Sequence, residues 1–287
     1  MANLKEIRNR ISSVGSTMQI TSAMKMVSAA KLKRAQDAVT QMRPYANKLR
    51  ELLVNLSATL EGSDGGAYSE TREVKKVLLV AITSNRGLCG AFNSNILKKA
   101  RGLADGEYSG CSVSFLTIGK KASVFFLKEG YSVLSSHDGL YDNLTFENTA
   151  AIAESMMEQF IAGDFDKVVL VYNQFKNAAS QNLMVEQFLP VETPEGEAAT
   201  IGDYIFDPSK EEIVTDLIPK SLKVQLFKGV LDSHASEHGA RMTAMHKATD
   251  NAGELRKDLK LTYNKARQAA ITGEILEIVG GAEALSG

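Results

Sequence analysis

The two ends of this chain share one repeat, apolar residues spaced alternately three and four apart, and this repeat constrains the fold more than any other feature. A sustained 3-4 spacing is typical of a coiled-coil seam, in which two helices bury a narrow apolar stripe against each other. The sequence therefore predicts a long helix at each end. The N-terminal seam comprises Leu4, Ile7, Ile11, Val14, Met18, Leu32, Ala35, Val39, Met42, Ala46, Leu49, Leu53 and Leu56, and the C-terminal seam comprises Leu231, Ala235, His238, Met242, Met245, Ala252, Leu259, Tyr263, Ala266 and Ala270.

Polar residues interrupt the N-terminal seam, and one proline lies within the N-terminal helical region and another at the start of the C-terminal one. Between Met18 and Leu32 the N-terminal seam becomes polar, and Pro44 is expected to bend the helix because it removes a backbone hydrogen bond. Pro219 is a plausible start for the C-terminal helix. An antiparallel pair whose inner ends lie near residues 56 and 220 would place Met24 opposite about residue 252, and leave roughly the last dozen residues without a partner helix.

The middle of the chain has a different pattern, in which short apolar runs alternate with helical segments. Such alternation is typical of a small, mostly parallel α/β sheet. Strands are predicted at 74–83, 113–119 and 168–175, with an antiparallel edge strand at 183–190, and helices at 93–104, 120–130 and 146–162. The predicted organisation is an N-terminal helix at 1–60, a central α/β domain at 61–219 and a C-terminal helix at 220–287.

Composition restricts the class of protein. With 44% hydrophobic and 23% charged residues, the chain can build a core and is not a disordered polymer. Two cysteines are too few for a disulfide framework, which favours a reducing compartment. The sequence shows no signal peptide and no apolar run of the roughly 18 residues that a membrane span requires. Any association with a membrane is therefore expected to depend on a partner.

The charge of the chain is unevenly distributed and leaves a second function class open. Residues 1–50 hold ten Lys and Arg against two acidic residues, a local balance of +8, whereas the whole chain has a net charge of -1. A basic arm fits nucleic acid or an acidic protein surface. A nucleic-acid-binding coiled-coil protein, or a scaffold, is therefore an alternative, although Tyr45 is the only aromatic residue in that arm.

The turn at 83–93, TSNRGLCGAFN, follows a strand and precedes a helix, which is where phosphate-binding loops occur. It has neither the GxGxxG spacing nor the Lys-Ser/Thr ending of a Walker loop. A tight turn that uses Gly87 and Gly90 is the simpler interpretation, and phosphate binding is the alternative.

His234, Glu237 and His238 match the H-x-x-E-H pattern of a group of zinc proteases. Histidines four residues apart on a helix could share a metal ion. However, His238 occupies a seam position, and neither a third ligand nor a pocket is evident, so a structural role is predicted and a zinc hydrolase is the alternative. Cys89 and Cys111 lack the spacing of a redox or metal motif. No catalytic residues, cofactor or metal site are predicted.

Several longer segments carry a family resemblance, which covers both ends of the chain and the first strand and turn of the middle. The chain resembles the gamma subunit of F-type ATP synthase in KEIRNRISSV, QITSAMKMVSAAKL (19–32), RPYA (43–46), SNRGLCGAFN (84–93), ATDNAGEL and YNKARQAAITGEILEIVGGAEAL. The resemblance implies an antiparallel coiled-coil shaft and a Rossmann-like α/β domain.

The same resemblance implies a function without catalysis. The gamma subunit is the central rotor stalk, which couples proton flow through the membrane ring to ATP synthesis or hydrolysis at the catalytic alpha and beta subunits. Its implied partners are the alpha and beta subunits, the epsilon subunit and the ring of c subunits, with no nucleic acid and no direct membrane insertion. A bacterial-type enzyme, peripheral on the cytoplasmic face of the inner membrane, is expected, because the regulatory cysteine pair of plastid forms is lacking.

The resemblance also implies contact residues. Arg241, Arg267, Gln268 and Thr272 match positions where the shaft meets a loop of a catalytic subunit, and Met24-Lys25 is expected nearby on the other helix. The family often has an acidic residue where this chain has Lys25. Arg and Gln have planar heads with several donors, which suits them to grip carboxylates or carbonyls. The apolar tip, with Ile271, Ile275, Ile278 and Val279, is expected to turn in an apolar sleeve.

Overall fold

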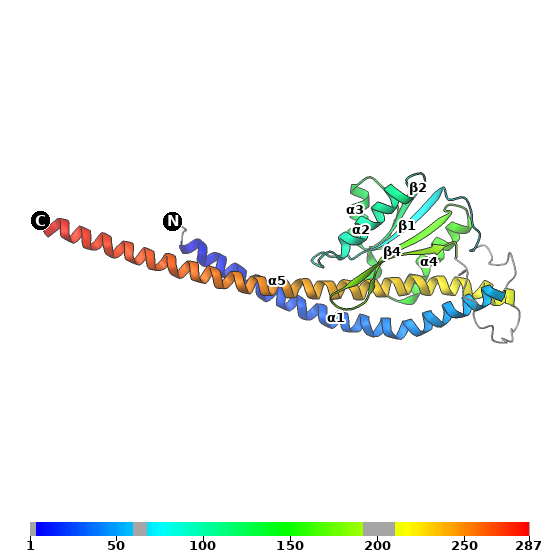
Figure 1. The fold of residues 1–287 in the computed structure, drawn as a ribbon, viewed down its shortest axis with the longest axis horizontal. Helices are drawn as coiled ribbons and strands as arrows, with labels where there is room; N and C mark the ends of the chain where they lie inside the picture. The colour runs from blue at the N-terminus through cyan, green and yellow to red at the C-terminus, as the bar shows by residue number, and fades with distance from the viewer. Residues whose placement is uncertain (1–3, 60–67, 192–209, 287) are drawn as a thin grey trace. The chain divides into compact units, whose positions relative to one another are not determined.

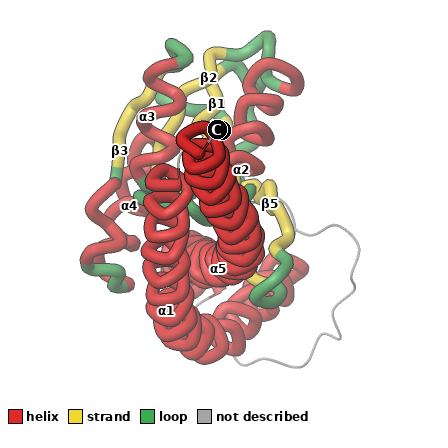
Figure 2. The backbone as a smooth tube through the Cα atoms, turned by 90° about the vertical axis from the view of Figure 1, so that its left-hand side faces the viewer, coloured by secondary structure: helices red, strands yellow, loops and turns green. Residues whose placement is uncertain are grey.

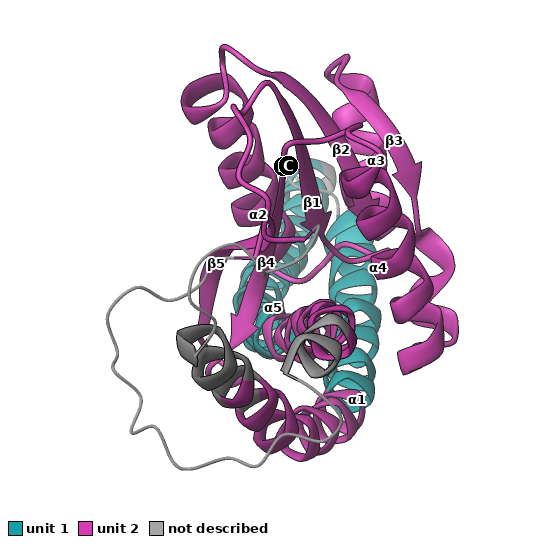
Figure 3. Cartoon of the chain, turned by 90° about the vertical axis from the view of Figure 1, so that its right-hand side faces the viewer, with its two compact units in different colours: residues 1–28, 242–287 teal, residues 29–241 magenta. Residues whose placement is uncertain are grey.

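A computed structural model describes residues 4–59, 68–191 and 210–286. Two long helices, α1 (Leu4–Thr59) and α5 (Lys210–Ser286), stand at the two ends of the chain (Figure 1). Contacts divide the chain into a helix-pair unit, residues 1–28 with 242–287, and an α/β unit, residues 29–241 (Figure 3). The elements of the α/β unit between the long helices are β1 (Lys76–Ile82), α2 (Phe92–Gly102), the short π-helix Leu103–Glu107, β2 (Ser112–Ile118), α3 (Lys120–Lys128), β3 (Ser132–Ser136), the 3-10 turn Asp138–Asp142, α4 (Phe146–Ile161), β4 (Lys167–Phe175) and β5 (Gln181–Leu189).

The helix-pair unit is an antiparallel pair, as the heptad pattern predicts. Arg8 donates a hydrogen bond to the Tyr263 hydroxyl at 2.8 Å, and the hydroxyl oxygens of Thr21 and Thr249 lie 2.8 Å apart. Residue numbers rise along α1 as they fall along α5, which defines the antiparallel direction. In both helices the seam residues form the buried and half-buried stripe. The side chains of Leu53 and Leu56, the last expected seam positions of α1, lie outside the described residues.

The expected register of the pair is wrong by about five residues. Lys25 contacts His246, so Met24 lies opposite about residue 247 and not 252. The error comes from Pro219, which was expected to start the helix but lies inside α5. A proline inside a helix costs about 3 kcal/mol. Here the neighbouring Ile218 and Leu222 are buried in the core, and this burial offsets that cost.

The sheet of the α/β unit has the strand order β3-β2-β1-β4-β5. β1 pairs in parallel with β2 and β4, and β5 is an antiparallel edge strand, both as predicted. Sequence analysis missed β3, which pairs in parallel with β2 at the other edge. Three of the five residues of its sequence SVLSS are serine and the strand is only partly buried, so it has no apolar run to mark it as a strand.

Helices cover both faces of this sheet, as Figure 2 shows. On one face, Phe92 and Ile96 of α2 and Phe126 of α3 pack against alternate residues of β1. On the other face, α4 and the start of α5 pack against the remaining residues of β1, such as Leu78 and Val80. A mostly parallel sheet needs this cover on both faces because both are apolar. The C-terminal helix is therefore part of the core of the α/β unit.

The C-terminal end of α5 exposes apolar side chains. Ile271, Ile275, Ile278 and Val279 are 48–70% exposed in this chain. Across the described ranges, no helix combines the length and apolarity needed to cross a membrane.

Candidate functional site

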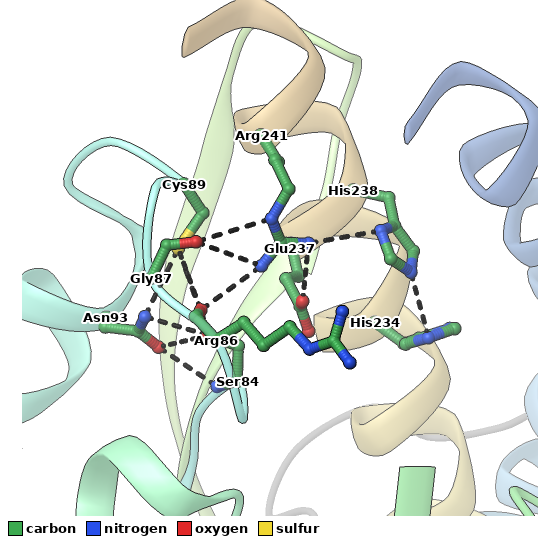
Figure 4. A network of polar contacts seen from close by, with 9 residues as sticks. All are labelled: Ser84, Arg86, Gly87, Cys89, Asn93, His234, Glu237, His238 and Arg241. Atoms are coloured by element: carbon green, nitrogen blue, oxygen red, sulfur yellow. Dashed lines mark hydrogen bonds and ion pairs between the residues drawn. The ribbon is translucent and has the colours of Figure 1, made fainter. Parts of the chain in front are cut away.

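The strand order places a topological switch point between β1 and β4. The chain leaves β1 toward β2 on one side and returns to β4 on the other. In open α/β sheets, ligands bind outside the carboxyl ends of the strands at such a point. Three features singled out in the sequence meet here: the turn at 83–93, the H-x-x-E-H motif and Arg241 (Figure 4). All of them belong to the α/β unit.

The turn after β1 is held in shape by its own side chains. Asn93, at the start of α2, accepts a hydrogen bond from the backbone N–H of Ser84 at 3.0 Å and donates to the Ser84 hydroxyl at 2.8 Å. Leu88 and Gly90 have φ angles of 62° and 58°. A left-handed leucine costs free energy and persists only when the surroundings fix it. The predicted tight turn is therefore confirmed, and hydrogen bonds between Asn93 and Ser84 hold its conformation.

A glycine on the neighbouring strand permits this packing. Gly119 follows β2 with a φ of 97°, and a Cβ there would lie 2.2 Å from the carbonyl oxygen of Thr83. No other residue fits without moving one of the two backbones. The carboxyl ends of β1 and β2 therefore approach closely beside the turn.

The side chain of Arg241 on α5 contacts the same turn. Its guanidinium donates to the carbonyl oxygen of Arg86 at 3.2 Å and to that of Gly87 at 3.4 Å (Figure 4). A phosphate-binding loop directs N–H groups toward its ligand. In this turn the carbonyl oxygens of Arg86 and Gly87 instead face the Arg241 cation, so the turn presents acceptors where a phosphate-binding loop presents donors. This geometry supports a structural turn over the phosphate-binding alternative.

Two serines of α5 bind the carboxyl ends of the two central strands. Ser233 donates to the carbonyl oxygen of Ile82 at 3.3 Å, and Ser236 donates to that of Asn173 at 3.0 Å. The contact is tight at Gly239, where a Cβ would lie 3.1 Å from the carbonyl oxygen of Ala178. The helix itself therefore lies over the switch point.

Buried charges surround Arg241. It forms an ion pair with Glu237 at 2.7 Å, and both side chains are 9% exposed. Burial raises the pKa of Glu237, and the neighbouring Arg241 opposes this shift. Burial also raises the pKa of the Cys89 thiol, so Cys89 stays protonated at neutral pH. A protonated, buried thiol is a poor nucleophile.

The two histidines of the H-x-x-E-H motif bind each other. Their Nε2 atoms lie 3.1 Å apart, and Arg241 contacts Nδ1 of His238 at 3.3 Å. Because the guanidinium can only donate, His238 carries its proton on Nε2 and donates it to His234. Burial lowers the pKa of His234 to about 4 and that of His238 to about 3.

This proton arrangement opposes metal binding. A metal held by both Nε2 atoms would require a proton on Nδ1 of His238, where the Arg241 donor already lies. Within the described ranges, no three His, Cys, Asp or Glu side chains gather as a metal site. The geometry favours the structural role that sequence analysis predicts for His234 and His238.

The predicted contact residues fall in three places. Lys25 lies within the helix-pair unit, where its Nζ contacts Nδ1 of His246 at 3.2 Å, and Met24 beside it is half-buried. Arg267, Gln268 and Thr272 are exposed on α5. At 1.5 Å per residue, about 32–39 Å of helix separates these three residues from His246. The structure therefore does not bring Met24-Lys25 together with these three residues.

Arg241 is placed differently from the other five. Its side chain is buried, and its donors are engaged with Glu237, His238 and the turn. Sequence analysis treated Arg241 as a surface residue and missed Ser233 and Ser236. One signal was present in the sequence. The segment DSHASEHGAR carries small or polar residues on every face, which is how a helix reads when it is surrounded by backbone.

These features define a class of protein: an antiparallel helix pair combined with an α/β sheet whose topological switch point is covered by its own C-terminal helix. Comparison with known proteins agrees. The sequence pattern of a family described as ATP synthase matches residues 3–285. The ATP synthase gamma chain of Flavobacterium johnsoniae is 69% identical over 288 residues, and that of Flavobacterium psychrophilum is 65% identical, each match covering all of both chains.

A solved structure shares the fold. A chain of the Euglena gracilis mitochondrial ATP synthase, in a structure of OSCP/F1/c-ring in rotational state 3, superposes with a TM-score of 0.71 at 25% identity. The match covers 98% of this chain and 94% of that one. The chain belongs to the ATP synthase gamma-chain family. It is thus a non-catalytic stalk subunit of that enzyme complex.

Proposed function

We propose that this chain is the rotating shaft that couples proton flow through a membrane ring to ATP synthesis and hydrolysis at catalytic alpha and beta subunits. The observation that carries the proposal is the family match over residues 3–285, and the antiparallel helix pair supports it. A shaft drives synthesis only if its faces interact differently with different conformations of the catalytic subunits. The driving energy is about 2.3 kcal/mol per charge for each 100 mV of membrane potential.

Three segments divide the work in this proposal. Residues 1–60 and 220–287 form the shaft, and residues 61–219 form the domain that faces the membrane ring and the epsilon subunit. The chain attaches to the cytoplasmic face of the bacterial inner membrane only through these partners. The exposed apolar tip around Ile275 and Ile278 fits a sleeve formed by the catalytic head, because apolar surface offers no directional bonds to hinder rotation.

Contacts that transmit torque are assigned to polar residues on the shaft. Arg267, Gln268 and Thr272 have exposed heads that can bind a loop of a catalytic subunit at one angle and release it at another. Met24-Lys25 forms a second contact, farther along the shaft. A hydrogen bond to a charged group is worth roughly 1.5–3 kcal/mol, enough to bias a rotary dwell without locking it. Arg241 contributes through the turn at 83–93 that it holds.

Copurification tests the proposal. The chain, tagged and extracted from its host membrane with a mild detergent, should bring down alpha, beta, epsilon and c subunits in a complex that hydrolyses ATP. A control extraction with the tag on an unrelated peripheral protein sets the background. Recovery of the chain alone, or with nucleic acid, would contradict the assignment.

A further inference from the structure

The switch point of the α/β unit holds a helix where related sheets hold a ligand. Ile218, Leu222, Leu226 and Val230 of α5 pack on one face of the sheet. About three turns farther on, Ala240 packs against the cluster on the opposite face. Between them, Ser233 and Ser236 bond the carboxyl ends of β1 and β4. Thus α5 crosses the carboxyl edge of the sheet at the switch point between β1 and β4.

The chemistry of this crossing is specific. On the sheet side, it consists of the carbonyl oxygens of Ile82, Arg86, Gly87 and Asn173, all acceptors. On the helix side, it consists of the donors Ser233, Ser236 and Arg241. The name socket is used below for these seven residues together with Gly239 and Ala178, whose backbones are in close contact.

Two kinds of contact differ in what they resist. The apolar face of α5 is close-packed against the sheet and resists displacement through the buried surface that a shift would expose, without bonds of a defined direction. Hydrogen bonds weaken steeply as their angle and distance change. The socket has three such donors at different heights on the helix, and the missing side chain at Gly239 lets the backbones approach. The socket therefore fixes the rotation and the axial position of α5 on the sheet.

We propose that this socket is the coupling that passes torque between helix α5 and the α/β unit. The proposal rests on the function proposed above, because torque passes through the chain only if it is a shaft. Ser233, Ser236 and Gly239 are positioning residues, which set how closely the sheet follows the rotation of the helix.

The test compares hydrolysis with pumping in assembled complexes in membrane vesicles. Ser233→Ala/Ser236→Ala removes two donors, and Gly239→Ala inserts a methyl group 3.1 Å from a carbonyl oxygen. We expect ATP hydrolysis per complex within twofold of wild type, and at least a threefold lower ratio of ATP-driven proton pumping to hydrolysis. Gly229→Ala is the matched control, since its methyl group would meet Tyr172 at an ordinary 3.6 Å. It should leave both rates unchanged.

Equal ratios in wild type and both variants would overturn the socket as a coupling. Absence of pumping in wild type would instead overturn the proposed function, so the two failures are distinguishable. A second measurement does not depend on assembly. In the full-length chain, hydrogen exchange at the Ser84 and Phe92 amides should be at least tenfold faster in the double serine variant than in Gly229→Ala. Unchanged exchange would also overturn the proposal.

Discussion

The hydroxyl groups of Thr21 and Thr249 lie 2.8 Å apart across the two helices and fix their register. The two hydroxyl protons serve three contacts: one threonine donates to the other, and the other donates to a carbonyl oxygen of its own helix, that of Met18 for Thr21 or of Met245 for Thr249. A polar pair in an apolar seam costs stability and penalises every register in which one hydroxyl loses the other.

This register predicts a crosslink. Cysteines at positions 21 and 249 should form an intramolecular disulfide under mild oxidation, because the side chains they replace are already in contact. Cys89 and Cys111 are first replaced by alanine, and the product is read from its mobility on a nonreducing gel. Cysteines at Met24 and Ala252, the pair opposed in the register expected from Pro219, should stay reduced. The reverse result would show that the register is wrong.

The histidine pair predicts a pH dependence of stability. His234 and His238 have folded-state pKa values of about 4 and about 3, below the ordinary 6.5. Their contribution is therefore present above pH 6.5 and is lost as the pH falls from 6.5 toward those values, by at most about 1.4 kcal/mol per pH unit for each histidine. Thermal unfolding of the full chain between pH 7 and pH 4.5 measures this loss.

The matched variant is His234→Gln/His238→Gln, which should unfold with a flatter pH dependence than wild type. The other groups at the pair, Lys31, Arg241, Glu237 and Tyr141, are common to both chains, so the difference isolates the histidines. Assembly and ATP turnover should stay within a few-fold of wild type. If the double variant lost both bound zinc and all activity, the structural role of the two histidines would be refuted.

Replacing Asp232 and replacing Arg43 should have different effects on the free energy of unfolding, although the two residues form one ion pair. Asp232 is fully buried and accepts from Arg43 at 3.2 Å, while its Oδ2 has no hydrogen-bond partner. Burial raises the pKa of Asp232, so at neutral pH its charge costs stability. Asp232→Asn should therefore change the free energy of unfolding little or raise it. Arg43→Ala removes the hydrogen-bonded ion-pair partner of this buried carboxylate and leaves Lys228 as the nearby cation, so it should lower the free energy of unfolding by about 1–3 kcal/mol. Urea unfolding at pH 7 compares them, and equal losses would refute this account.

Gln268 tests the contact surface of the shaft. Gln268→Leu should slow both ATP synthesis and hydrolysis severalfold while the complex stays assembled, because leucine keeps the helix but removes both donors. Lys260→Leu, on the same helix and also exposed, is the control and should match wild type. Rates are measured on purified, fully assembled complexes. If the Gln268 variant kept wild-type rates, Gln268 would make no functional contact and would belong to the solvated face of the helix.

Local pattern in the sequence was enough for most elements of the fold. The apolar stripe from Leu4 to Leu49 and that from Leu231 to Ala270 predicted both long helices, since a 3-4 repeat repeats its signal every turn. The segments of β1, β2 and β4 predicted buried strands because each is a short apolar run. Ser132–Ser136 gave no such signal, because an edge strand of serines buries little apolar surface.

What the sequence determined by itself is therefore most of the elements, the antiparallel pairing of the long helices and the family, because each of these is encoded in a periodic pattern or a contiguous motif. The tertiary structure alone decided the register, the inclusion of Pro219 in α5 and the burial of Arg241. It alone also showed that Ser233 and Ser236 bind the carbonyl oxygens of Ile82 and Asn173. The physical reason is that these bonds join a side chain to backbone atoms 151 and 63 residues away. Backbone carbonyls are alike at every residue, so only their position in space selects the partner.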